Sequence, residues 1–167
     1  MTEPAPKREA FWYRWLVKPV ATQLSQGTEP RKVAQAIAFG LTIGIFPVLG
    51  TPTALSLVLG IPLRLNQPVV QVFRELAYPL QLATVLLFIR AGEWLFGIPH
   101  TPLSLSLMFQ RFFAGPLLFL KDYGMLALFA VAVWLLIAPL LIALLYCGSL
   151  PLVKLVSNHL PPAPHAA

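Results

Sequence analysis

Charged side chains are scarce in this sequence. They make up 11% of the 167 residues, whereas 57% of the residues are hydrophobic. A soluble domain usually has about a quarter charged residues, and at this length roughly 30% of the unfolded surface stays exposed after folding, so this much apolar surface cannot be hidden. Intrinsic disorder is also excluded, because it needs low hydrophobicity and high charge. The remaining class is an integral membrane protein.

Residues that usually carry chemistry are also few. The chain has one cysteine, Cys147, and one aspartate, Asp122, so an intramolecular disulfide is excluded. The histidines His100, His159 and His165 have no metal-ligand spacing to a second histidine, a cysteine or a carboxylate. A nucleophile elbow, a P-loop and a dinucleotide-binding fingerprint are also missing. We therefore expect no enzymatic activity, no metal and no cofactor.

The basic residues are unevenly placed. Half of the twelve precede the first long apolar stretch, namely Lys7, Arg8, Arg14, Lys18, Arg31 and Lys32. This distribution predicts a cytoplasmic N-terminus, with a basic leader over 1–32 that contains an amphipathic surface helix at 8–18. The leader lacks the cleavage site of a signal peptide. It would attract anionic lipid headgroups, and we expect no nucleic-acid partner.

The first charge-free run, 33–63, is broken in its middle. Phe46, Pro47, Gly50 and Pro52 interrupt any continuous helix there. Two full crossings of a membrane plus a turn would need roughly 40 residues, and only 31 are present. We predict two short helices, at about 33–45 and 52–63, that form a re-entrant hairpin.

Small residues recur along the first arm of this hairpin. Ala36, Gly40 and Gly44 are spaced by four residues, which puts them on one face of a helix. A smooth strip of this kind lets a second helix approach closely. We interpret the strip as a helix-packing surface.

The second apolar unit, 68–90, begins with Pro68 and is interrupted at Tyr78-Pro79. It is either a kinked span or a second broken hairpin. Phe46-Pro47 and Tyr78-Pro79 are 32 residues apart, an offset that suggests a weak internal repeat. Paired, proline-interrupted segments are typical of transporter sites near the membrane midplane.

Arg74 and Glu75 are the most informative charges. A charge at membrane depth is costly, so it usually faces a partner or a wet cavity. We predict a substrate or headgroup site from Arg74, Glu75, Tyr78 and Pro79, with Arg74 binding an anionic headgroup. The alternative is that both charges lie at headgroup depth and extend into water.

The C-terminal part contains the clearest span. We predict an interfacial segment at 98–122, a transmembrane helix at 123–150 with a kink at Pro139, and a tail at 151–167. If the first hairpin returns to the cytoplasm at Arg64 and 68–90 crosses outward, the C-terminus lies inside. If 68–90 is re-entrant, the C-terminus lies outside.

One stretch resembles a bacterial membrane family known as domain of unknown function 2062. The resembling residues are Gly40, Gly44, Pro47, Gly50 and Thr53, followed by the connection Arg64, Asn66 and Pro68. The likeness covers about residues 30–97, and Tyr78-Pro79 stands where this family would have Asn-Pro. The resemblance implies a role in the bacterial inner membrane, beside glycosyltransferases or acyltransferases of envelope-lipid synthesis.

We therefore expect an all-α integral membrane protein. It has an N-terminal interfacial helix, a membrane domain of Gly/Pro-broken hairpins at 33–97, and a C-terminal transmembrane helix. Its function is that of a small transporter or lipid-handling protein of the envelope. The alternative is a scaffold for a lipid-modifying enzyme. So few helices could enclose a pathway only in a homo-oligomer, which we also expect.

Overall fold

A computed structural model describes residues 17–99 and 105–159 of the chain. Within these ranges the regular structure is helical, as expected, and the helices are α1 (Lys18–Ser25), α2 (Pro30–Gly44), α3 (Pro52–Gly60), α4 (Gln67–Leu76), α5 (Tyr78–Phe96), α6 (Leu105–Ala114) and α7 (Pro116–Asn158). Helix α1 follows the surface helix predicted at 8–18, most of which lies outside the described residues. The end of the predicted tail, from residue 160 onward, also lies outside the described residues.

Proline explains where most of these helices begin. A proline occupies the first or second position of α1 to α5 and of α7. Its fixed φ suits the first helical turn, where its missing N–H would have no partner within the helix. Pro79 is therefore the start of α5 rather than a defect inside a longer helix. Only Pro139 and Pro151 lie inside a described helix, α7.

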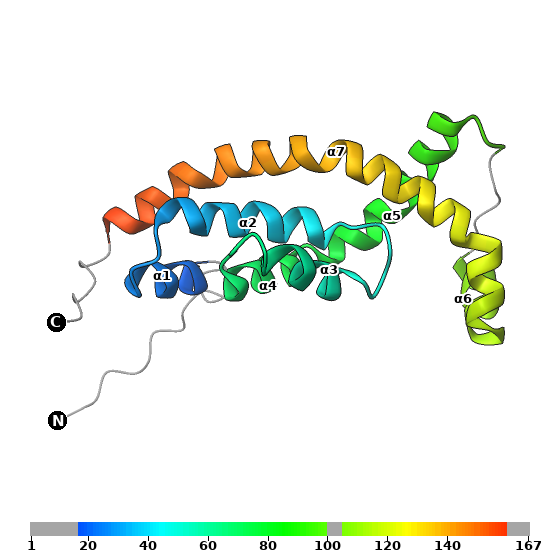
Figure 1. Ribbon diagram of the computed structural model, residues 1–167, viewed down its shortest axis with the longest axis horizontal. Helices are drawn as coiled ribbons and strands as arrows, with labels where there is room; N and C mark the ends of the chain where they lie inside the picture. The colour runs from blue at the N-terminus through cyan, green and yellow to red at the C-terminus, as the bar shows by residue number, and fades with distance from the viewer. Residues whose placement is uncertain (1–16, 100–104, 160–167) are drawn as a thin grey trace, which may run out of the picture.

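The long helix α7 arches over the length of the molecule (Figure 1). Helix α2 lies along its C-terminal half, and α1, α3 and α4 form a layer on the other side of α2. Helix α5 packs against the N-terminal half of α7, and α6 lies at the end of the molecule far from α1 and from the C-terminal end of α7. The main packing partners of α7 are thus α2 along its C-terminal half and α5 along its N-terminal half.

The two proline-interrupted units have different shapes. The first folds back on itself through the loop 45–51, so α2 and α3 are the two short helices predicted at 33–45 and 52–63. The second does not fold back, because α5 leaves the end of α4 at Ala77 and packs on α7 instead. The unit at 68–90 is accordingly a kinked pair of helices, and the suggested repeat has no counterpart in the arrangement of the helices.

The core consists of two clusters of buried apolar side chains joined by α7. One cluster gathers α1, α2, α4 and the C-terminal end of α7, including Val33, Val70 and Val153. The other joins α5 to α7 around Phe88 and Trp134. Trp134 also donates a hydrogen bond from Nε1 to the carbonyl oxygen of Thr42 at 3.1 Å. This indole therefore ties the second cluster to the end of α2.

Helix α7 is longer than the predicted span. It begins at Pro116 and runs for 43 residues, so it includes part of the interfacial segment predicted at 98–122 and the start of the tail predicted at 151–167. The rest of that interfacial segment contains α6 and the break at Gly115. The glycine and the proline that follows it begin the long helix earlier than the apolar pattern alone indicated.

Two of the described helices are long and apolar enough to cross a membrane, Tyr78–Phe96 and the part of α7 over Tyr123–Asn158. Only 28% and 22% of their most apolar windows are buried inside the protein. A core helix of a soluble protein would be mostly buried. These helices instead present exposed leucines such as Leu87, Leu136 and Leu144, and a membrane accounts for such a surface.

Two glycines of the small-residue strip let α2 and α4 touch. A Cβ atom added at Gly40 would lie 2.7 Å from the carbonyl oxygen of Val70, and one at Gly44 would lie 2.5 Å from the Cβ of Ala77. Both distances are shorter than the non-bonded contacts that a real Cβ atom makes, so a side chain has no room at either position. The backbones of the two segments are therefore in direct contact here. Ala36, one turn earlier, is fully buried on the same helix.

The Gly44→Ala variant should destabilise the protein by about 1–3 kcal/mol, because the new methyl group overlaps Ala77 and the backbone of Arg74. The matched control is Gly148→Ala in α7, where nothing lies within 4 Å and the free energy should change by less than about 1 kcal/mol, toward stability. Thermal unfolding of both variants in one detergent checks this. Equal melting temperatures would contradict the close packing.

Candidate functional site: a polar junction between two helix breaks

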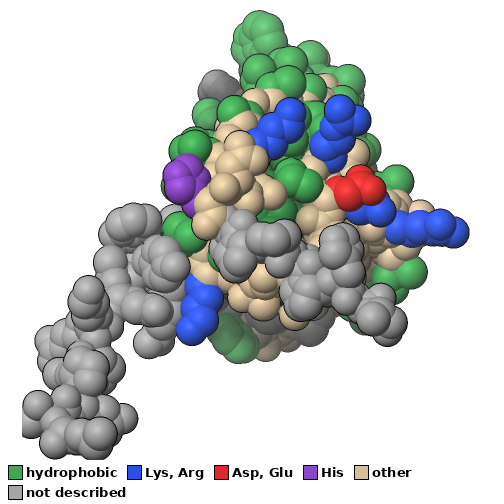
Figure 2. Space-filling model, turned by 90° about the vertical axis from the view of Figure 1, so that its left-hand side faces the viewer, with side chains coloured by type: hydrophobic (Ala, Val, Ile, Leu, Met, Phe, Trp, Pro, Cys, Tyr) green, Lys and Arg blue, Asp and Glu red, His purple; other side chains and the backbone are tan. Residues whose placement is uncertain are grey.

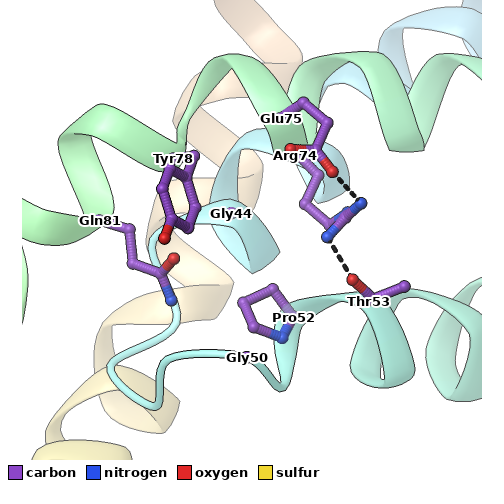
Figure 3. A pocket seen from close by; sticks show the side chains of 8 residues that line it. All are labelled: Gly44, Gly50, Pro52, Thr53, Arg74, Glu75, Tyr78 and Gln81. Atoms are coloured by element: carbon purple, nitrogen blue, oxygen red, sulfur yellow. Dashed lines mark hydrogen bonds and ion pairs between the residues drawn. The ribbon is translucent and has the colours of Figure 1, made fainter.

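The two helix breaks meet in the middle of the molecule. The loop 45–51 after α2 lies against the start of α5, where Gln81 Nε2 donates a hydrogen bond to the carbonyl oxygen of Phe46 at 2.6 Å. Beside this contact is a cavity of about 180 Å³. Its lining, which we call the polar junction, comprises Gly44, Gly50, Pro52, Thr53, Arg74, Glu75, Tyr78 and Gln81 (Figure 3).

Arg74 is the centre of the hydrogen bonding at the polar junction. Its Nε donates to Gln71 Oε1 at 2.9 Å, and its Nη1 donates to Thr53 Oγ1 at 2.6 Å. Its Nη2 forms an ion pair with Glu75. The Arg74 side chain is only 12% exposed, whereas that of Glu75 is 59% exposed. The guanidinium is thus fixed between α3 and α4, and the carboxylate remains accessible.

The hydrogen bonds continue away from the cavity into the protein. Gln71 Nε2 donates to Ser56 Oγ at 3.0 Å, and the Ser56 hydroxyl donates to the carbonyl oxygen of Thr53 at 2.7 Å. Ser56 is fully buried. A chain of this kind holds each member in one orientation, since a buried polar group without a partner is costly. Gln71 and Ser56 therefore position Arg74.

Gln81 is fully buried, yet its amide oxygen Oε1 has no hydrogen-bond partner. The orientation of the amide is set by the bond from Nε2 to Phe46, because only the nitrogen can donate to a carbonyl oxygen. Oε1 consequently points the other way, toward Tyr78 and the cavity (Figure 3). The Gln81 amide oxygen is therefore a hydrogen-bond acceptor at the polar junction that has no donor among the described residues.

The residues predicted for a site are partly brought together. Arg74, Glu75 and Tyr78 line the cavity, as do Gly50 and Pro52 of the first break. Pro79, the fourth residue predicted for the site, follows Tyr78 in the chain but does not line the cavity. Neither do Phe46 and Pro47, the other two residues predicted for the first break.

The connection lies at the opposite end of α4. Asn66 caps this helix, because its Oδ1 accepts from the Val69 N–H at 3.3 Å, and its Nδ2 donates to Gln23 Oε1 in α1 at 2.6 Å. Pro68 is in the first turn of α4, and Arg64 adopts a left-handed backbone with φ of 51°. Arg64, Asn66 and Pro68 thus shape the turn between α3 and α4, one helix length away from the polar junction.

Four polar residues of the site were not predicted as site residues: Thr53, Ser56, Gln71 and Gln81. A signal for the two glutamines was present in the sequence. Polar residues recur at alternating steps of four and three, from Gln67 just before the second apolar unit to Gln71, Arg74, Tyr78 and Gln81 within it. That spacing places all five on one face of a helical segment. A polar stripe within an apolar unit predicts a polar contact surface, of which Arg74 is only the charged member.

Five of the nine Lys and Arg residues within the described ranges lie at one end of the molecule. Figure 2 shows this end, where Lys and Arg side chains outnumber acidic ones. We call it the basic end and define it by exposed residues at the starts of α1 and α2, in the α3–α4 turn and near the end of α7: Lys18, Arg31, Lys32, Arg64 and Lys154. A second charged region lies on α5, where Arg90 Nη1 contacts the buried Glu93 Oε2 at 2.7 Å.

The chain was compared with known protein families. Residues 13–159 match the family model described as an uncharacterized protein conserved in bacteria, DUF2062. The chain belongs to this family. The match confirms the resemblance found in the residues from Gly40 to Pro68 and extends it through α7. No curated protein and no solved structure matches the chain.

The Gln81→Met variant should loosen the contact between the two breaks. Methionine has a similar size but cannot donate to the Phe46 carbonyl, so the loop 45–51 should exchange its amide hydrogens about tenfold faster, as the loss of one buried hydrogen bond implies. Hydrogen–deuterium exchange read by mass spectrometry measures this. The control is Thr84→Val, because the Thr84 hydroxyl bonds only to carbonyls of its own helix. Unchanged exchange in Gln81→Met would contradict the bridging role.

Proposed function

We propose that this protein is an integral protein of the bacterial inner membrane that binds the headgroup of a membrane lipid at the polar junction. The observation that carries the proposal is the guanidinium of Arg74, held by three side chains beside a cavity, where the surrounding helices are apolar. An arginine so oriented is suited to phosphate, which it can bind through two parallel N–H groups.

The position of Arg74 along the molecule supports a location within the membrane. Along α2, Gly44 of the junction is 13 residues beyond Arg31 at the basic end, a rise of about 20 Å. Along α5, Arg90 is 12 residues beyond Tyr78 of the junction, a rise of about 18 Å. Among the described residues, Arg74 and Glu75 are the charges that lie between these two charged regions. A hydrocarbon core about 30 Å thick would include them.

The orientation follows from the basic end. Lys and Arg near membrane spans favour the cytoplasmic side, so we place the basic end there. The C-terminal end of α7 is beside the start of α2, because Ser149 Oγ bonds to the Ala34 carbonyl at 3.4 Å and Val153 packs in the same cluster as Val33. Both therefore lie on one side, and α5 and α7 cross the membrane in opposite directions.

A C-terminal fusion tests this topology. We expect a green fluorescent protein fused after Ala167 to fluoresce and an alkaline phosphatase fused there to be inactive, because only the periplasm supports the phosphatase and the C-terminus is expected inside. A phosphatase fused after Gly97, at the end of α5, should be active and serves as the matched control. An active C-terminal phosphatase would reverse the proposed orientation of α7.

Lipid binding should depend on Arg74. We expect the purified Arg74→Gln variant to retain about tenfold less phospholipid than wild type after detergent washing, because the charge-assisted bonds to a phosphate are lost. Native mass spectrometry counts the bound lipids. The control is Lys32→Gln, which removes one positive charge at the basic end and should retain lipid at the wild-type level.

Because Arg74 also joins α3 to α4, a second variant separates binding from folding. Arg74→Lys keeps the charge beside Glu75 but loses the planar fork, so it should fold with a melting temperature near that of wild type and retain an intermediate amount of lipid. Wild-type lipid retention in both variants would contradict the proposal. If a lipid-modifying enzyme then copurified with the chain, the scaffold hypothesis would take its place.

A further inference from the structure

The polar junction carries one positive and one negative charge on the same cavity. Arg74 and Glu75 are paired with each other, and the other lining residues are uncharged, so the lining is neutral overall. A purely anionic headgroup placed against Arg74 would be close to the exposed carboxylate of Glu75, and like charges at such distances repel. A headgroup with both charges would meet an opposite charge on each side.

The hydrogen-bonding groups of the polar junction further restrict which chemical groups the ligand must have. The guanidinium has five N–H donors, and its bonds to Gln71, Thr53 and Glu75 use three of them, through Nε, Nη1 and Nη2. Donors therefore remain for the oxygens of a phosphate. On the other side, the buried Gln81 Oε1 lacks a donor. A phosphodiester has no N–H or O–H to give, so the matching donor must lie elsewhere on the ligand.

We propose that the polar junction recognises a phosphodiester that bears a primary ammonium group, as in a phosphoethanolamine headgroup. The phosphate binds Arg74, and the ammonium lies between Glu75 and the Gln81 amide oxygen. A cavity of about 180 Å³ lined by these groups suits a small headgroup of this kind. The inference rests on the proposed function, because it assigns the class of lipid that the same site binds.

Three lipids with identical acyl chains test the assignment. Phosphatidylethanolamine has the ammonium donor, phosphatidylcholine has a positive charge without a donor, and phosphatidylglycerol has hydroxyl donors and a net negative charge. We expect the purified full-length chain, given an equimolar mixture, to bind phosphatidylethanolamine about fivefold more than either other lipid, as measured by native mass spectrometry. Equal or greater binding of phosphatidylglycerol would overturn the inference.

Two variants should change this preference in different ways. Glu75→Gln removes the repulsion of an anion, so binding of phosphatidylglycerol should rise, and it removes the ionic partner of the ammonium, so binding of phosphatidylethanolamine should fall. The fivefold preference for phosphatidylethanolamine should therefore disappear. Gln81→Met removes the acceptor, so phosphatidylethanolamine should fall to the level of phosphatidylcholine. A gain of binding in Glu75→Gln cannot come from misfolding. An unchanged preference in both variants would overturn the inference.

Further arms separate the remaining explanations. Glu29→Gln removes an exposed carboxylate near the basic end and should leave the preference unchanged; a shift equal to that of Glu75→Gln would assign the effect to overall charge and overturn the inference. Soluble glycerophosphoethanolamine should not displace the lipid at equal concentration, and equal competition would assign the site to a soluble ester.

If phosphatidylglycerol is preferred but binding still requires Arg74, only the headgroup assignment fails. If no lipid binding requires Arg74, the proposed function fails as well.

Discussion

The carbonyl groups at the end of α2 impose the constraint on which the rest of the structure depends. A helix leaves its last four carbonyl oxygens without partners in the helix, and in apolar surroundings each must find a donor. The Thr42 carbonyl accepts from the Trp134 indole of α7, and the carbonyl of Phe46, just beyond the helix, accepts from the Gln81 amide of α5. The break in the first hairpin is therefore stabilised by donors from two other helices. Those two contacts bring α5 and α7 to one point and create the polar junction.

The small residues of α2 make this arrangement sterically accessible. With no side chain at Gly44, α4 can end directly against α2, and Ala77 lies where a larger residue would separate them. This contact sets the place at which α4 stops and α5 begins. The charged pair on the last turn of α4 is thereby brought to the helix break, and the Gln81 side chain, one turn into α5, reaches the loop. A packing surface and a candidate binding site are two consequences of one close approach.

Much of the fold could be predicted from the sequence, because proline and glycine act locally. The break at Phe46–Pro52 and its two short helices follow from backbone chemistry within seven residues. The course of 68–90 could not be decided in the same way, since a helix that restarts at Pro79 can turn back or continue. The outcome depends on packing of α5 against α7, more than thirty residues later in the chain. The charges of the site were predictable for a related reason: Arg74 stands out in an apolar unit, whereas the roles of Gln71 and Gln81 depend on contacts with α3 and with the loop.

The length of α7 has a consequence for the membrane around it. From Lys121 to Lys154 the helix rises about 50 Å, against a hydrocarbon core about 30 Å thick. This hydrophobic mismatch requires the helix to tilt, to bend or to thicken the bilayer locally. Helix α7 is arched along its length (Figure 1), and Pro139 inside it removes one backbone hydrogen bond of the helix. Bilayer thickness thus acts on the angle between the two halves of α7. The C-terminal half packs against α2 and the N-terminal half against α5, and both of these helices contribute residues to the polar junction.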